Sequence, residues 1–225
     1  MNILIFGNGS KFGLTLTTCA IQKGHKVYGI TGKSNNSPNS LTVDWNSCTM
    51  ADVDSYLRQL PELDAIILNQ NSMGLNVDYA TLGLTENFSN EFKQWGQSFF
   101  VNCILPMQAL HILSSSKKIK HDSRVVYMLS RSIMTHNHPM PPMDYKGQKF
   151  QNYVTMQSLA RNNSQIFLGM CPGWLNPKNY EHRANRILDF VTRATKEHSG
   201  NFYYLQEDHF DKLTNVIYEK QIATS

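Results

Sequence analysis

The sequence predicts an α/β protein in which a parallel, doubly wound sheet lies between two layers of helices. Short apolar runs alternate with helical patterns along most of the 225 residues, and parallel strands need crossover connections of that kind. The chain has no internal repeat and no linker rich in proline and glycine. We therefore expect one domain over residues 1–225, with residues 206–225 as a C-terminal extension.

The first unit is a strand, a tight turn and a helix. The apolar run Asn2–Phe6 ends at Gly7, and the helical pattern over 14–23 ends at Gly24, because glycine readily adopts the left-handed conformation that stops a helix. A second strand over 25–31 follows directly. A strand–helix–strand unit is therefore predicted at the amino end of the chain.

The alternation then continues to residue 205. Further strands are predicted at 40–44, 64–69, 124–130, 165–171 and 201–205, and helices at 51–60, 92–115, 149–161 and 180–195. Right-handed crossovers dominate between parallel strands, so this order favours helices on both faces of one sheet.

The composition bounds the partners that the chain can have. Hydrophobic residues make up 41% and charged residues 17%, which favours a globular core over extensive disorder. The net charge of +4 comes from scattered lysines and arginines, so nucleic acid is not expected as a partner, whereas a phosphate-bearing small ligand is compatible. We expect no membrane span, because no run reaches the roughly 18 apolar residues that one requires. We expect a cytoplasmic protein with reduced cysteines.

A glycine-rich turn, GNGSKFG, follows the first strand and precedes the first helix. Its members are Gly7, Gly9, Ser10, Lys11, Phe12 and Gly13. Small residues let the backbone approach a diphosphate, and a helix N-terminus supplies free N–H groups and the positive end of a dipole. This placement predicts a dinucleotide site of the Rossmann type.

More polar residues follow later strands in a fixed order. Asp44 ends the third strand, Asn69 and Asn71 end the fourth, and Ser130 ends the fifth. Pro172 and Gly173 follow the sixth strand, Asn102 lies in the long helix, and Tyr145 and Lys149 begin the next helix. The spacing of Tyr145 and Lys149 places them on one helical face, where an ammonium would lower the pKa of a phenol.

In this order and spacing, residues 1–205 resemble the short-chain dehydrogenase/reductase family. The resemblance implies that the glycine turn holds a cofactor diphosphate, that Asp44 contacts the adenine region, and that Asn69 and Asn71 support the cofactor pocket. Pro172 and Gly173 would border the same pocket. It also implies a homodimer or homotetramer formed through helices.

The resemblance further implies a catalytic set of four residues. Tyr145 would exchange a proton with the substrate oxygen, and Ser130 would donate a hydrogen bond to that oxygen. Lys149 would hold the nicotinamide ribose and lower the pKa of Tyr145, and Asn102 would fix a water in the proton relay. A carbonyl that accepts hydride develops negative charge on oxygen, which requires such donors. The expected reaction is hydride transfer between a nicotinamide cofactor and a carbonyl or alcohol.

Three departures from the family pattern leave alternatives open. Lys11 stands where the middle glycine of the turn is expected, and Asn176-Pro177 replaces the threonine expected after Gly173. Ser130 precedes Tyr145 by 15 residues, about two more than the family pattern implies, so Ser132 is an alternative for the serine role. The position of Ser130 at the strand end favours Ser130. A nucleotide-binding regulatory or scaffold protein with the same fold is therefore the alternative function.

The cofactor preference depends on the end of the second strand. An acid there would bind the ribose hydroxyls and repel a 2′-phosphate, but the segment contains Lys33 and no acid. This favours NADP over NAD. The alternative is that Lys33 is one solvated loop lysine among many. His136 and His138 lack further ligands, so no metal is expected. Trp174 would either cap the nicotinamide or pack in the core.

Overall fold

One eight-stranded sheet forms the centre of the computed structural model, which describes residues 1–32, 39–43, 50–71, 88–133, 143–206 and 209–213. The strands are β1 (Asn2–Phe6), β2 (Lys26–Thr31), β3 (Ser40–Thr42), β4 (Leu63–Leu68), β5 (Ile119–Met128), β6 (Ile166–Cys171), β7 (Phe202–Gln206) and β8 (His209–Leu213). Their order is β3-β2-β1-β4-β5-β6-β7-β8, and all neighbours are parallel except β7 and β8. The predicted doubly wound α/β fold is confirmed.

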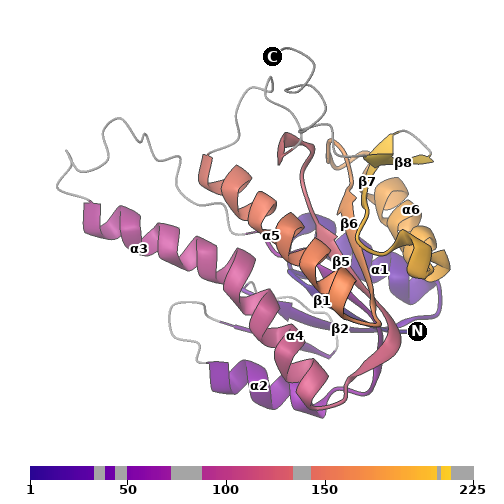
Figure 1. Cartoon of the computed structure of the whole chain (residues 1–225), viewed down its shortest axis with the longest axis horizontal. Helices are drawn as coiled ribbons and strands as arrows, with labels where there is room; N and C mark the ends of the chain where they lie inside the picture. The colour runs from indigo at the N-terminus through magenta and orange to yellow at the C-terminus, as the bar shows by residue number, and fades with distance from the viewer. Residues whose placement is uncertain (33–38, 44–49, 72–87, 134–142, 207–208, 214–225) are drawn as a thin grey trace.

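Helices cover both faces of this sheet (Figure 1). The helices of the chain are α1 (Lys11–Gln22), α2 (Met50–Gln59), α3 (Phe88–Phe99), α4 (Leu105–Ser115), α5 (Met143–Asn162) and α6 (Tyr180–Arg193), and α3 projects beyond the sheet (Figure 1). Helices α1 and α6 share one core with the sheet, and α2, α4 and α5 share the core on the other face. The chain therefore has the three layers that its alternating pattern predicts.

The side chains of β1 show how one strand contributes to both cores. Ile3 and Ile5 lie in the core beneath α1 and α6, whereas Leu4 and Phe6 lie in the core beneath α2, α4 and α5. All four are buried. A strand that is covered on both faces is apolar throughout, which explains why its sequence shows no alternation with polar residues.

Strand β5, helix α5 and strand β8 show clear differences from the sequence prediction. Strand β5 begins at Ile119, five residues before the predicted start, because exposed His121 and Asp122 hide the strand from an apolar pattern. Helix α5 begins at Met143, six residues before its predicted start, and its first described turns bury the polar Gln148 and Lys149. The antiparallel strand β8 lies within the predicted extension and was not predicted.

The long predicted helix is interrupted by a π-helical turn, Phe100–Ile104, between α3 and α4. Such a turn releases backbone groups from the regular helical ladder and often lies at a functional site. The run Lys93–Ser115 is long and apolar enough to cross a membrane, and half of it is buried inside the protein. The core helix of a sheet protein meets the same criterion.

Candidate active site

The turn between β1 and α1 is held closed by a network of hydrogen bonds. The Gly7 N–H donates to the Ile30 oxygen at 2.7 Å, and the Ser10 N–H donates to the Gly7 oxygen at 3.1 Å. The Ser10 hydroxyl caps α1 by accepting from the Gly13 N–H at 3.0 Å. The turn lies beside the end of β4, where the strand order reverses between β1 and β4. Nucleotides bind at such switch points.

Both outer glycines of the turn are required by close contacts. A Cβ on Gly13 would lie 2.1 Å from the Gly7 oxygen, and a Cβ on Gly7, which has a φ of +74°, would lie 2.9 Å from the Gln70 Cα. Any side chain at either position would open the turn. Steric contacts thus explain why the sequence has glycine at both positions.

Two main-chain amides at the N-terminus of α1 are available to bind a diphosphate. The Gly13 N–H is taken by Ser10, while the N–H groups of Lys11 and Phe12 have no partner in the described part of the chain. The Lys11 side chain is exposed and Phe12 is buried. Free amides at a helix start bind anions, so the turn fits the phosphates of a dinucleotide.

The polar residues after β4 have separate positions. Asn69 donates to the Gly7 oxygen at 3.5 Å and to the Ser10 hydroxyl at 3.3 Å, so it braces the turn. Asn71 is exposed. Gln70 is buried, and its side-chain oxygen has no hydrogen-bond partner in the described structure. The end of β4 therefore supports the turn chiefly through Asn69.

Tyr145 and Ser130 meet at the carboxyl end of β5. Their side chains form a hydrogen bond, and the Ser130 hydroxyl lies 2.9 Å from the Ser132 hydroxyl. Ser132 is buried, whereas Ser130 is half-buried. The structure therefore places Ser130 against Tyr145 and Ser132 behind Ser130.

Lys149 lies one helical turn beyond Tyr145 and is enclosed by protein. Its ammonium donates to the Met128 oxygen at 2.9 Å and lies 5.6 Å from the centre of the Tyr145 ring. Burial lowers the pKa of Lys149 to about 8, and the nearby Cys103 and Cys171 oppose this shift. The ammonium thus retains a proton less tightly than an exposed lysine does.

The pKa of Tyr145 differs from the sequence expectation. Burial raises it above its ordinary value, and the hydrogen bond from Ser130 opposes this rise only in part. We expected Lys149 to lower the pKa. Instead, the protein interior disfavours the phenolate, so Tyr145 in this structure is a protonated donor near neutral pH.

Asn102 lies in the π-helical turn and is bound on two sides by α5. Its side-chain nitrogen donates to the Gln148 oxygen at 2.6 Å, and its main-chain oxygen accepts from the Asn152 side chain at 3.0 Å. All three residues are buried. The π-helical turn frees backbone groups from the regular helical ladder. Asn152 on α5 binds one of these groups, the Asn102 main-chain oxygen. The sequence analysis did not single out Gln148 and Asn152. These two residues are four apart on the same helix, as Tyr145 and Lys149 are.

The segment after β6 completes this edge of the sheet. The Cys171 sulfur accepts backbone hydrogen bonds from Gly173 and Arg131, and Pro172 is buried. Trp174 is 83% exposed, so it does not pack in the core. The Asn179 side chain holds the Trp174 main-chain oxygen at 2.8 Å. A fixed backbone therefore presents an exposed indole close to the end of β6.

Some predicted residues lie outside the described part of the chain, namely Lys33, Asp44, His136 and His138. Gly9 lies in the described turn and is half-buried. Among the residues that the structure describes, no group of three metal-ligating side chains comes together. The structure thus brings Asn102, Ser130, Tyr145 and Lys149 to one end of the sheet. The glycine turn follows β1 at the same end, and β4 lies between β1 and β5.

Several solved structures that are similar to this chain are dehydrogenases or reductases. A carbonyl reductase from Pseudomonas aeruginosa PAO1 is 20% identical, with a TM-score of 0.69 over 91% of this chain and 95% of that chain. A short chain dehydrogenase family protein from Francisella tularensis is 15% identical, with a TM-score of 0.69 over 91% and 96%. A short-chain dehydrogenase/reductase variant from Serratia marcescens is 13% identical, with a TM-score of 0.70 over 91% and 95%.

The chain therefore has the fold of short-chain dehydrogenase/reductase proteins over nearly its whole length and theirs. No protein-family model matches the chain, and no curated protein matches it in sequence. The likeness is thus one of structure, and the chemistry has to be argued from the residues of this chain.

Proposed function

We propose that this chain is an NAD(P)-dependent oxidoreductase that acts on a carbonyl or alcohol, with Tyr145 as the proton donor and acceptor. The observation that carries the proposal is the hydrogen bond between Tyr145 and Ser130 beside the buried Lys149. A phenol, a hydroxyl and an ammonium in one largely dry site are the groups that a carbonyl needs as it is reduced. A protein that only binds nucleotide has no chemical need for them.

Tyr145 and Ser130 would act directly on the substrate oxygen. The raised pKa of Tyr145 keeps its hydroxyl protonated near neutral pH, which suits the donation of a proton to a carbonyl that becomes an alcohol. Ser130 would donate a hydrogen bond to the same oxygen, and Ser132, 2.9 Å away, would orient the Ser130 hydroxyl. The reverse reaction requires Tyr145 to lose its proton first.

Lys149 and Asn102 would support this pair. Lys149 is fixed by the Met128 oxygen, and its remaining protons would bind the nicotinamide ribose. Asn102 is fixed by Gln148 and Asn152, and we assign it the positioning of a water in the proton relay. Both side chains are held by neighbours, as an arrangement that must not reorganise during reaction requires.

The cofactor would lie across the β1–α1 turn, with its diphosphate on the amides of Lys11 and Phe12. The nicotinamide, when bound, supplies or accepts the hydride. Gly7, Gly9, Ser10 and Gly13 would shape the turn. The other cofactor contacts that we propose are those of Asp44, Asn69, Asn71, Pro172 and Gly173. Lys33 after β2 favours NADP over NAD, because no acid there would repel a 2′-phosphate.

Two measurements on the purified chain test this function. Paired calorimetric titrations with NADPH and NADH should show binding, with the tighter affinity for NADPH and a loss of this preference in Lys33→Ala. A screen of carbonyl and alcohol substrates should then show cofactor turnover. Binding of neither cofactor would refute the proposal, and tighter binding of NADH would refute the preference alone.

One observation favours the alternative of a regulatory or scaffold protein that binds nucleotide with little turnover. The side-chain nitrogen and main-chain oxygen of Asn102 are both engaged by α5, which limits the room for a relay water. The departures from the family pattern at Lys11 and Asn176-Pro177 also favour a protein with little turnover. Nucleotide binding without turnover across a broad substrate panel would establish this alternative.

We also propose that the chain is a cytoplasmic protein that forms a homodimer or homotetramer through helices. Phe150 and Val154 lie one turn apart on α5 and are 45% and 44% exposed. Apolar side chains that recur at this spacing form a stripe that a second helix can cover. Light scattering should give a mass above that of one chain, and Val154→Glu should lower it. A monomeric parent protein would refute this assignment.

A further inference from the structure

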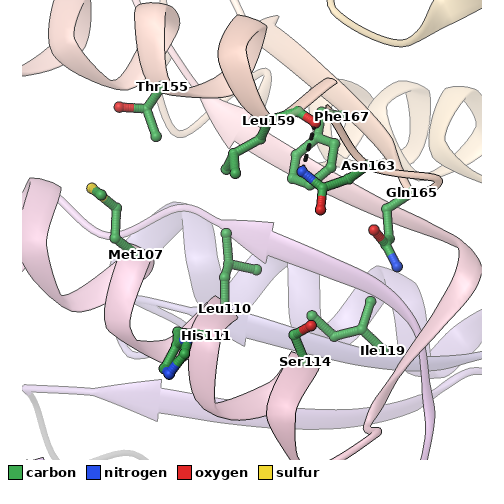
Figure 2. Close-up of a pocket in the computed structure, with 10 residues that line it drawn as sticks. All are labelled: Met107, Leu110, His111, Ser114, Ile119, Thr155, Leu159, Asn163, Gln165 and Phe167. Carbon is green, nitrogen blue, oxygen red and sulfur yellow. Dashed lines mark hydrogen bonds between the residues drawn. The ribbon is translucent and has the colours of Figure 1, made fainter. Parts of the chain in front are cut away.

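A cavity lies between α4 and α5 (Figure 2). Its lining residues place it at the opposite end of the sheet from the candidate active site. It borders Ile119 and Gln165, at the amino ends of β5 and β6, whereas Ser130 and Trp174 follow the carboxyl ends of the same strands. Its volume is about 250 Å³. An engineered apolar cavity of about 150 Å³ binds benzene, so this space is large enough for a substituted ring.

The lining is divided into an apolar and a polar part. Leu110, Leu159 and Phe167 form the apolar part, with Met107 at one end of the cavity. Ser114, Asn163 and Gln165 lie together at the other end (Figure 2). A ligand that fills both parts needs an apolar body and one polar end.

The hydrogen bonds of the two amides define what that polar end must be. The Asn163 nitrogen donates to the Leu159 oxygen at 2.8 Å, and the Gln165 nitrogen donates to the Lys120 oxygen at 3.2 Å. Neither amide oxygen has a partner in the described part of the chain. Each amide keeps an unpaired oxygen and a second N–H, so the pair can both accept a hydrogen bond from a ligand hydroxyl and donate one to it.

The side chains that line the cavity favour a neutral ligand over an ionic one. The lining residues include no Asp, Glu, Lys or Arg, and the only titratable side chain among them is the exposed His111. A charged group that leaves water for the apolar part of the cavity would gain no counter-ion from these residues. A neutral hydroxyl can donate its one proton to either amide oxygen without that cost.

We propose that the cavity between α4 and α5 is a second binding site, which takes a small neutral phenol or alcohol. The hydroxyl would donate to the Asn163 or Gln165 oxygen, with Ser114 as a further partner, and the apolar body would lie on Leu110, Leu159 and Phe167. This site is separate from the cofactor turn, and the proposal does not depend on the proposed function.

The test is a titration of the full chain with 4-ethylphenol, followed by amide proton–nitrogen correlation spectra. The matched probe is 4-ethylanisole, the methyl ether, which has the same apolar body and no donor. We expect saturable shifts confined to α4, to the carboxyl half of α5 and to the starts of β5 and β6. The ether should bind about tenfold more weakly, as expected for the loss of one hydrogen bond.

Two variants locate the site. Thr155→Trp fills the apolar end of the cavity and should abolish binding, whereas Thr18→Trp, on an exposed position of α1, should leave binding unchanged. Should Thr155→Trp not fold, Ser114→Trp at the exposed polar end serves in its place. Absence of saturable shifts, equal binding of the two probes, or binding that survives the filled cavity would each overturn the proposal.

Discussion

The Tyr145 hydroxyl shares a hydrogen bond with Ser130, and the two residues belong to different elements of the chain. Ser130 follows β5, whereas Tyr145 lies near the start of α5. Their contact depends on the fold, because residues 134–142 separate the two elements. The pair gives the proposed proton transfer a geometric basis.

Removal of Ser130 should cost more activity than removal of Ser132. Ser130→Ala deletes a donor to the substrate oxygen and should lower turnover by about 10²-fold. Ser132→Ala removes only the partner of Ser130 at 2.9 Å, so its loss should be clearly smaller. Steady-state rates of the two variants decide this, with thermal unfolding as the control for folding. A larger loss in Ser132→Ala would exchange the two roles.

The pH dependence of alcohol oxidation should reflect the raised pKa of Tyr145. Oxidation needs the phenolate as proton acceptor, and burial disfavours that form. The oxidation rate should therefore rise with pH, through an ionisation that lies above the ordinary pKa of tyrosine. Ser130→Ala removes a hydrogen bond that lowers the pKa, so the residual activity should have its profile shifted to still higher pH. A profile centred below the ordinary tyrosine value would contradict this account.

Lys149 should make the folded protein less stable below pH 8. Its pKa is about 8 in the folded chain, against 10.5 for an unperturbed lysine. The unfolded chain therefore binds more protons between these two pH values, and stability rises with pH there. Below pH 8 both states are protonated, and the burial cost is fully present. Lys149→Met should therefore raise the melting temperature most at neutral pH, with a gain that shrinks from pH 8 to 10.5. A constant gain, or a loss at neutral pH, would contradict the lowered pKa.

The sequence predicted the parallel sheet and the glycine turn because both depend on local patterns. Gly7 and Gly13 lie where neighbouring backbone atoms leave no room for a Cβ. The residue type alone therefore indicates the tight turn. The spacing of Tyr145 and Lys149 likewise placed them on one face of a helix.

What the sequence could not predict depends on burial and on distant partners. The desolvation that raises the pKa of Tyr145 comes from its surroundings in the fold, and no spacing rule contains it. Gln148 and Asn152 read as surface amides, yet both are buried against the π-turn that carries Asn102. Strand β8 is half-exposed, so its pattern lacks an apolar run.

Substitution of Gly13 should abolish cofactor binding. In Gly13→Ala the new Cβ would lie 2.1 Å from the Gly7 oxygen, so the turn must open and its free amides must move. Gly96→Ala is the matched control, because no atom lies within 4 Å of a Cβ at that position on α3. Calorimetric titration with NADPH should show binding to the control alone. Undiminished binding to Gly13→Ala would place the cofactor elsewhere.

Loss of the Gln148 side chain should disturb both stability and turnover. Gln148→Ala leaves the buried Asn102 amide without its 2.6 Å partner, which should cost about 1–3 kcal/mol of unfolding free energy. A positioning role predicts that turnover falls while the KM for substrate changes little, and that Gln148→Glu restores part of the turnover by keeping the acceptor. Equal turnover in Gln148→Ala and the parent would reduce the residue to a packing role.

The most direct test of the central claim is the turnover of Tyr145→Phe with a nicotinamide cofactor and a carbonyl substrate. We expect NADPH binding to be retained and the rate of cofactor consumption to fall by at least roughly 10²-fold, as for the loss of a general acid. Tyr153→Phe, two turns further along α5, is the matched control and should keep the parent rate, because its hydroxyl accepts from Gln157 away from this pair. If Tyr145→Phe consumes cofactor at the parent rate, Tyr145 is not the proton donor and the proposed mechanism is wrong.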